Sequence, residues 1–202
     1  MTFALSRRRL LAGVGAFAVA PAFAAAPASD AMQAVLDYVE SQKTTGFLVV
    51  RDRKTLAEKN WPAPAGVPLF SAFTYETTAE GALLEDVASQ QKSFVAVLIA
   101  IAVDKGLLDV ETPVSDIIGG GWSKAPAADE RAIRVIHLLN MTSGLNEQFE
   151  RVAEAGTVFF YNTPAYAVTK RVLEAVAKQP LETITQNWLT RPAGMTNTAW
   201  RK

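Results

Sequence analysis

SQQKSFVAVLIAIAVDKG, residues 89–106, is the stretch of sequence that decides the fold. Phe94 to Val103 is almost uninterrupted apolar sequence, and it ends at Asp104-Lys105-Gly106, where a cation and a glycine suit a helix C-terminus. The apolar run is shorter than the roughly 20 residues that a membrane-spanning helix needs. We therefore expect a buried central helix.

Ser89 and Lys92 lie three residues apart at the start of this helix. Residues i and i+3 share a helix face, so the amine can reach the hydroxyl. The positive end of the helix favours an alkoxide, and burial beside apolar residues makes lysine a better base. Ser89 is thus a candidate nucleophile and Lys92 its partner. The alternative is an N-cap serine beside a solvated lysine, and the spacing alone does not decide between them.

A serine and lysine also need a proton relay to the leaving group, and a phenol near a lysine can serve because the cation favours phenolate. Tyr161-Asn162-Thr163 fits such an element, and Tyr75-Glu76-Thr77 fits it loosely. The alternative for Tyr161 is a core aromatic that continues Phe159 and Phe160.

The segments before the central helix predict a helix followed by a hairpin. Apolar residues at helical spacing predict an amphipathic helix over 31–42, with Ser29 or Asp30 as its N-cap. Residues 46–50 and 55–61 are the expected strands, joined by the polar turn 51–54. We expect loops over Pro62–Pro68, because of its prolines, and over the polar residues 76–88.

The segments after the central helix predict more helices and one extended stretch. Residues 111–130 are expected to be loop, and their glycines lack the Lys-Ser/Thr of a phosphate-binding loop. Residues 131–141 predict a helix that stops at Gly144. Residues 158–161 have extended propensity, and helices are expected over 165–177 and 181–189.

The amino-acid composition argues against several classes of partner and catalytic site. The chain has 20 basic and 20 acidic residues, so no strong field would attract nucleic acid. It has no cysteine and one histidine, His137, which argues against thiol nucleophiles, disulfides and the usual structural zinc sites. We expect no metal and no cofactor, and a small-molecule substrate.

The N-terminus has the layout of a signal peptide. Ser6-Arg7-Arg8-Arg9-Leu10-Leu11 precedes an apolar run to about residue 24 and small-residue cleavage sites. The pattern resembles the twin-arginine signal of bacterial export. We expect residues 1–28 to be removed, leaving an exported, periplasmic domain over 29–202 with no membrane span. The alternative is an N-terminal membrane anchor.

Five landmarks follow one another along the chain: ASQQKSF (88–94), GLLD with PV (106–109 and 113–114), IHLLNMTSGL (136–145), GTVFFYN (156–162) and PAGMTNTAW (192–200). With this order, residues 45–200 resemble the β-lactamase-related serine hydrolase family. That family joins class C β-lactamases, D-alanyl-D-alanine carboxypeptidases, some esterases and the 6-aminohexanoate-dimer hydrolases. The segment 120–125, GGWSKA, is most similar to the last group.

The resemblance implies an α+β fold (an α/β sandwich) of β-lactamase/transpeptidase type, with a helical subdomain and an incomplete antiparallel sheet. It implies Ser89 as the acylated nucleophile, Lys92 as its base or charge partner and Tyr161 as the proton relay. Asn162 and Thr163 would orient Lys92 or the substrate, an amide, ester or peptide. His137 would be structural, since the sequence has no Gly-x-Ser-x-Gly elbow.

The sequence departs from the family in one respect. The family has a Lys- or His-x-Gly strand well after the Gly-Met-Thr landmark, which donates an oxyanion-hole N–H, whereas this sequence stops at Lys202. Losing such a donor costs about 2.7 to 4 kcal/mol. We therefore expect a truncated relative whose open sheet edge favours self-association. Three functions stay open: an active hydrolase, a catalytically weak or silent relative, and a cell-wall binding module without turnover.

Overall fold

A computed structural model describes residues 29–201, which form two compact units, one ending at Glu85 and the other beginning at Asp86. The predicted signal peptide, residues 1–28, lies outside the described residues. No helix within residues 29–201 is long and apolar enough to cross a membrane.

The first unit begins with the predicted helix and hairpin. Helix α1 spans Asp30–Ser41, and the Ser29 hydroxyl caps it by accepting from the Met32 N–H at 3.4 Å. Strands β1 (Gly46–Arg51) and β2 (Lys54–Asn60) pair antiparallel. Their two-residue turn has positive φ at Asp52 (51°) and Arg53 (61°), as type I′ turns require. Both predictions are confirmed.

The rest of the first unit is more ordered than the sequence predicted. A short helix α2 (Pro68–Phe73) starts where a loop was expected to end. Strands β3 (Thr74–Thr77) and β4 (Leu83–Glu85) form a second antiparallel pair, so the expected loop over 76–88 is wrong in part. A turn that includes Gly81, with φ 82°, joins these strands. At four and three residues, these strands are too short to show an alternating pattern.

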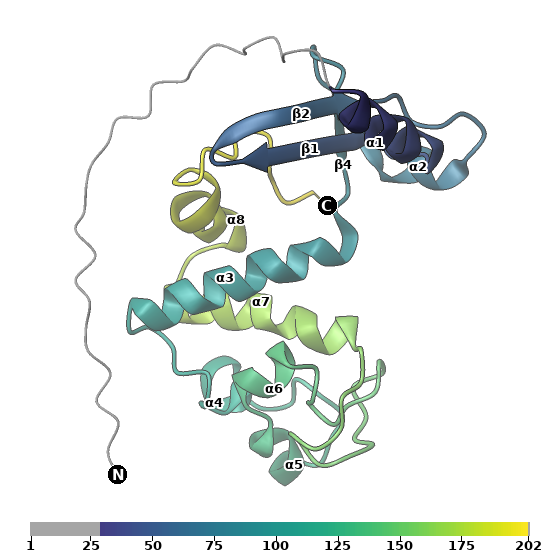
Figure 1. The fold of residues 1–202 in the computed structure, drawn as a ribbon. Coiled ribbons are helices and arrows are strands. Elements are labelled where there is room, and N and C mark those ends of the chain that lie inside the picture. Colours follow the sequence, from purple (N-terminus) through teal and green to yellow (C-terminus); the bar gives the residue numbers. More distant parts are fainter. Residues whose placement is uncertain (1–28, 202) are drawn as a thin grey trace, which may run out of the picture. The chain divides into compact units, whose positions relative to one another are not determined.

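Two helices form the centre of the second unit. A 3₁₀ turn, η1 (Ala88–Gln90), leads into α3 (Gln91–Asp104), and α3 packs against α7 (Thr163–Ala177), as Figure 1 shows. Helix α8 (Leu181–Thr185) continues into the π-helical turn η2 (Gln186–Thr190). These helices confirm the predicted central helix and both C-terminal helices.

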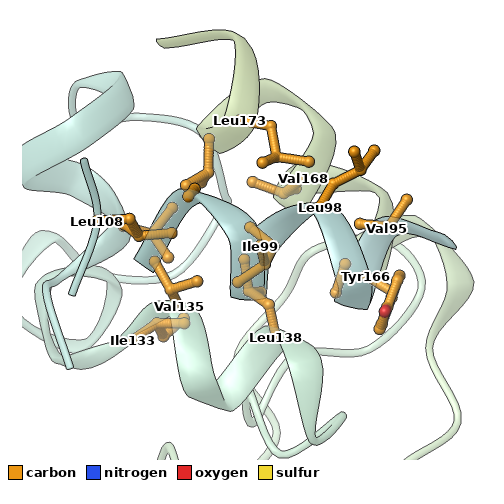
Figure 2. Close-up of a cluster of buried hydrophobic side chains, with 14 of the residues drawn as sticks. Val95, Leu98, Ile99, Leu108, Ile133, Val135, Leu138, Tyr166, Val168 and Leu173 are labelled. Carbon is orange, nitrogen blue, oxygen red and sulfur yellow. The ribbon is translucent and has the colours of Figure 1, made fainter. Parts of the chain in front are cut away.

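The core of this unit is apolar and well buried (Figure 2). It takes one face of α3, namely Val95, Leu98, Ile99 and Ala102, and packs it against Val168, Val172 and Leu173 of α7. At about 25 cal/mol per Å² of apolar surface buried, this contact is the main stabilising force available to α3. The same packing fixes the start of α3 relative to the start of α7.

Short helices replace predicted loop in the middle of the second unit. They are α4 (Val114–Ile118), α5 (Ala127–Ala132) and α6 (Val135–Leu139). The expected loop over 111–130 is therefore wrong in part, and the expected helix over 131–141 is shorter. Pro113 and Pro126 precede α4 and α5, and Met141 has φ 55°, incompatible with a continuing helix.

The extended stretch 158–161 forms no strand. Its side chains are exposed, and the Phe160 N–H donates to the Met141 carbonyl at 2.9 Å. Helix α7 starts two residues earlier than predicted, with Pro164 in its first turn. In the described residues the strands make two separate two-stranded sheets, and with the helices they confirm a mixed α+β fold.

Candidate active site

Ser89 lies in the turn that precedes α3. The preceding residue, Ala88, has φ 46°, and its N–H donates to Asp86 Oδ1 at 2.6 Å. A left-handed backbone is costly for a residue with a Cβ, so the surrounding contacts must hold this turn in place. The turn leaves Ser89 exposed, ahead of the first full turn of α3.

The three predicted site residues meet at the Ser89 hydroxyl. Lys92 Nζ donates to Ser89 Oγ at 2.9 Å, and Tyr161 Oη lies 2.6 Å from the same oxygen, with either oxygen able to be the donor. Ser89 is not the N-cap of α3, and Tyr161 is 51% exposed. The alternatives of a capping serine and of a core tyrosine are therefore wrong.

Asn162 holds Tyr161 at the start of α7. It is the helix N-cap, with Oδ1 accepting from the Ala165 N–H at 3.0 Å and Nδ2 donating to the Leu145 carbonyl at 2.9 Å. The Asn162 side chain is 1% exposed, and both its oxygen and its nitrogen are hydrogen-bonded to backbone groups. The Thr163 side chain contributes, as the smallest of several causes, to lowering the pKa of Tyr161. That Asn162 and Thr163 orient Lys92 or the substrate stays a prediction.

The electrostatic environment favours negative charge on the phenol. The hydrogen bond with Ser89 lowers the pKa of Tyr161, and the hydrogen bond and the positive charge of Lys92 act in the same direction. Lys92 Nζ also lies 5.1 Å from the centre of the Tyr161 ring and 5.9 Å from that of Tyr166. The arrangement can therefore pass a proton between an amine, a hydroxyl and a phenol.

Tyr166 supports the site, and the sequence reasoning missed it. Its side chain is buried, and its Oη donates to the Lys92 carbonyl at 2.8 Å. Burial raises the pKa of Tyr166, which keeps the phenol protonated as a donor. Helical spacing could have indicated that Tyr166 is buried, because Tyr166 lies two turns before Leu173 and so shares its inward face.

Glu130 organises the segment 120–125, and it too was missed. Its side chain is 3% exposed, with Oε1 accepting from the Gly121 N–H at 2.7 Å and the Ser115 hydroxyl at 3.3 Å. Oε2 accepts from the N–H and the hydroxyl of Ser123, both at 2.7 Å. Burial alone would raise the pKa of Glu130, but these hydrogen bonds outweigh it and lower the pKa.

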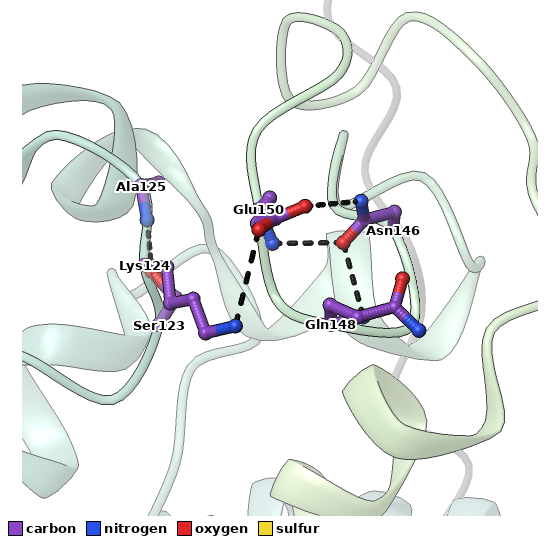
Figure 3. A network of polar contacts seen from close by, with 6 residues as sticks. All are labelled: Ser123, Lys124, Ala125, Asn146, Gln148 and Glu150. Atoms are coloured by element: carbon purple, nitrogen blue, oxygen red, sulfur yellow. Dashed lines mark hydrogen bonds and ion pairs between the residues drawn. The ribbon is translucent and has the colours of Figure 1, made fainter.

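A second polar network ties this segment to the loop after Leu145 (Figure 3). Lys124 Nζ lies 3.9 Å from Glu150 Oε1, and Asn146 Nδ2 donates to Glu150 Oε2 at 2.9 Å. Asn146 Oδ1 accepts from the N–H groups of Gln148 and Glu150. Since the Leu145 carbonyl accepts from Asn162, the network continues to the start of α7, beside Tyr161.

His137 has a structural position. Its Nδ1 accepts from the Arg134 N–H at 3.2 Å, and burial, followed by the charge of Arg134, lowers the pKa of His137. It is therefore the neutral imidazole that serves here as an acceptor. Within residues 29–201, no group of three or more His, Cys, Asp or Glu side chains is placed to hold a metal ion.

Solved structures similar to this chain share its fold. A β-lactamase/D-alanine carboxypeptidase from Yersinia pestis is 15% identical, with a TM-score of 0.64 over 86% of this chain and 57% of its own. FmtA from Staphylococcus aureus is 14% identical, with a TM-score of 0.62 over 82% of this chain and 49% of its own. An octameric penicillin-binding protein homologue from Pyrococcus abyssi is 17% identical, with a TM-score of 0.59 over 82% of this chain and 42% of its own.

The chain thus spans about half the length of these solved relatives. No curated protein matches the sequence significantly. The sequence model of the Beta-lactamase family, however, matches residues 33–202, which is most of the chain and includes Ser89, Lys92 and Tyr161. The family expected from the landmarks is therefore confirmed, and the chain belongs to the Beta-lactamase family.

Proposed function

We propose that this chain is a serine hydrolase that cleaves amide or ester bonds through an acyl-enzyme on Ser89. The observation that carries the proposal is the hydrogen-bonded series from Lys92 Nζ through Ser89 Oγ to Tyr161 Oη, at 2.9 and 2.6 Å. A nucleophile, its proton acceptor and a relay within hydrogen-bond reach are the requirements of nucleophilic catalysis without histidine.

In the proposed acylation, Ser89 Oγ attacks the substrate carbonyl carbon and gives its proton to the Lys92 amine or to the Tyr161 phenolate. The positive end of α3 favours the developing alkoxide. When the tetrahedral intermediate collapses, Tyr161 Oη passes the proton to the departing nitrogen or oxygen. The carbonyl–heteroatom bond breaks, and the acyl group stays on Ser89. Water then attacks the ester along the same proton path in reverse.

The proposed substrates are linear amides or esters, of the 6-aminohexanoate-dimer type, or cyclic amides of the β-lactam type. Two observations support this class. The segment 120–125, which resembles the 6-aminohexanoate-dimer hydrolases, is joined by the Lys124–Glu150 ion pair to the loop after Leu145, and the Leu145 carbonyl accepts a hydrogen bond from Asn162. The name of the Yersinia pestis structure joins β-lactamase and D-alanine carboxypeptidase activities, both of which break amide bonds.

The second candidate function is a catalytically weak or silent relative. The observation that favours it is the length of the solved relatives, of which this chain covers about half. Segments of those proteins without a counterpart here can contribute groups that stabilise the oxyanion, and one such donor is worth about 2.7 to 4 kcal/mol.

Labelling by a fluorophosphonate probe separates the two candidates. We expect the purified chain to be labelled at Ser89, as located by peptide mass spectrometry, and Ser89→Ala to remain unlabelled. Lys92→Met and Tyr161→Phe should slow labelling by about 10²- to 10⁴-fold, the usual contribution of general acid–base catalysis.

Ser93→Ala is the matched control, because Ser93 is an exposed serine one turn further along α3. It should label at the rate of the unmodified chain. Equal labelling of Ser89→Ala would refute the assignment of the nucleophile. Absence of labelling in a chain with native circular dichroism would favour the silent relative.

A further inference from the structure

Strand β1 of the first unit has one edge without a neighbouring strand. In the described part of the chain it belongs to a two-stranded sheet and pairs only with β2. The Trp61 N–H donates to the Thr45 carbonyl at 3.0 Å, and residues that face the neighbouring strand alternate along an antiparallel ladder. The backbone N–H and C=O groups of Gly46, Leu48 and Val50 therefore point away from β2. These three residues form the open edge of β1.

The open edge lacks the features that protect edge strands in proteins, which are charges, prolines and bulges. From Gly46 to Val50 the sequence GFLVV has no charge and no proline, and Leu48 and Val50 are 59% and 55% exposed. The opposite edge, on β2, has three charged residues and a bulge at Leu56, which the pairing with β1 skips. Strand β1 is therefore the edge that favours pairing with another chain.

We propose that β1 is a homodimer interface, in which β1 of a second copy pairs antiparallel with it about a twofold axis at Leu48. In this register the two Leu48 backbones exchange two hydrogen bonds, and Gly46 of each copy exchanges two with Val50 of the other. All three residues of the open edge are then paired. The twofold axis joins the two open edges to each other, so assembly stops at two copies. The proposal goes beyond the hydrolase function and does not depend on it.

The same register brings opposite charges together at each end of the paired strands. Arg51 of one copy lies opposite Thr45 of the other, and directly opposed residues share a face of the sheet. The Thr45 hydroxyl donates to Glu85 Oε2 at 2.6 Å, so a carboxylate lies beside that position. Within residues 29–201 Glu85 forms no ion pair, and Arg51 has only an exposed one with the adjacent Asp52. A register shifted by two residues would oppose Arg51 to a phenylalanine or a lysine instead.

Sedimentation equilibrium of the full chain tests the association. We expect a monomer–dimer equilibrium between about 1 μM and 1 mM. Leu48→Lys opposes like charges at the twofold axis and should weaken dimerisation by about tenfold, without affecting folding, because Leu48 is exposed. Leu56→Lys is the matched control, an exposed leucine on the protected edge, and should leave the dimer unchanged. A monomer at every concentration, species larger than a dimer, or equal losses in both variants would overturn the proposal.

Cross-linking tests the register, because the chain has no cysteine of its own. Opposed Cα atoms of a hydrogen-bonded antiparallel pair lie about 5.5 Å apart, which a disulfide can span. Leu48→Cys should therefore give a disulfide-linked dimer under mild oxidation. Val50→Cys should not, because its two copies lie four residues, or about 13 Å, apart along the strands. Equal cross-linking of the two variants would show that the proposed pairing is wrong.

Two further measurements test the charge contact and the identity of the partner. Arg51→Glu should weaken dimerisation by about three- to tenfold, and adding Glu85→Arg to the same chain should restore it, whereas no recovery would contradict the contact. Hydrogen exchange of the dilute monomer should leave the Leu48 N–H unprotected. Protection of that N–H in the monomer would mean that another segment of the chain covers β1, and the proposal would fail.

Discussion

Replacing Glu130 with glutamine removes one charge from the interior of the second unit and keeps the shape of the side chain. The two carboxylate oxygens accept four hydrogen bonds, two of them from the backbone N–H groups of Gly121 and Ser123. Glutamine has one accepting oxygen, so one of these N–H groups must face an NH₂ group. The hydroxyls of Ser115 and Ser123 can rotate to become acceptors, but a backbone N–H cannot.

The expected cost follows from these contacts. A buried donor without an acceptor costs about 1 to 3 kcal/mol, and hydrogen bonds to a charged group are worth more than those to a neutral one. We expect Glu130→Gln to lower the free energy of unfolding by about 2 to 4 kcal/mol at pH 7. Urea unfolding followed by far-ultraviolet circular dichroism measures this, since the second unit holds most of the helix. Glu111→Gln is the control, because the Glu111–Arg134 ion pair is exposed and should contribute less than about 1 kcal/mol.

The effect should depend on pH with a definite sign. The pKa of Glu130 in the folded chain lies below its ordinary value of 4.5, so the charge stabilises the fold fully above that value. This stabilisation is lost as the pH falls through the lower, folded pKa. The difference between the unmodified chain and Glu130→Gln should therefore be constant near neutral pH and shrink in acid. A difference below about 0.5 kcal/mol at pH 7, or one equally large in strong acid, would refute the reasoning.

Two further substitutions test backbone geometry and core packing. Gly144→Ala should destabilise by about 3 kcal/mol or more, because φ is 74° and the new Cβ would lie 2.4 Å from the Ala153 carbonyl oxygen. Gly106 also has a positive φ, 69°, but a Cβ added there would have no atom within 4 Å, so Gly106→Ala should cost only about 1 to 2 kcal/mol in the same urea assay. Equal costs for the two glycines would show that the contact with Ala153 does not contribute. Leu98→Ala should cost about 2 to 5 kcal/mol because Leu98 is fully buried. Val97 is an exposed neighbour, so Val97→Ala should change the free energy of unfolding by less than about 1 kcal/mol. Thermal unfolding measures both variants, and a similar loss at both positions would contradict the assigned core face.

The long helices could be predicted because their sequence carries its own signal. Phe94 to Val103 is apolar enough to demand burial, and α7 repeats apolar residues at helical spacing. Helices α4 and α5 span only five and six residues, too few to show a period. For 158–161, β propensity favoured a strand, but this propensity acts through pairing with a neighbouring strand. Among residues 29–201 this stretch pairs with no strand, and its Phe160 N–H donates to the Met141 carbonyl instead.

The site residues also differ in whether their local sequence carries the signal. Ser89 and Lys92 could be found from spacing, since one helical turn brings them together. Tyr161 could be assigned only through the order of the landmarks, because its contact with Ser89 depends on how α3 packs against α7. Tyr166 acts across the same interface, so nothing in its local sequence indicates a partner. Contacts between elements are set by tertiary packing, which a single sequence does not display.

The contact between Ser89 and Tyr161 closes a loop of 72 residues. The serine–lysine half of the site needs only one turn of helix, which forms in well under a millisecond, whereas the tyrosine arrives only when two distant segments have docked. The entropy of closing a loop rises slowly with its length, so the docking must be stabilised by the core between α3 and α7. Recovery of helical signal during refolding should therefore precede recovery of a reactive Ser89, and the interval between the two would time the docking of these helices.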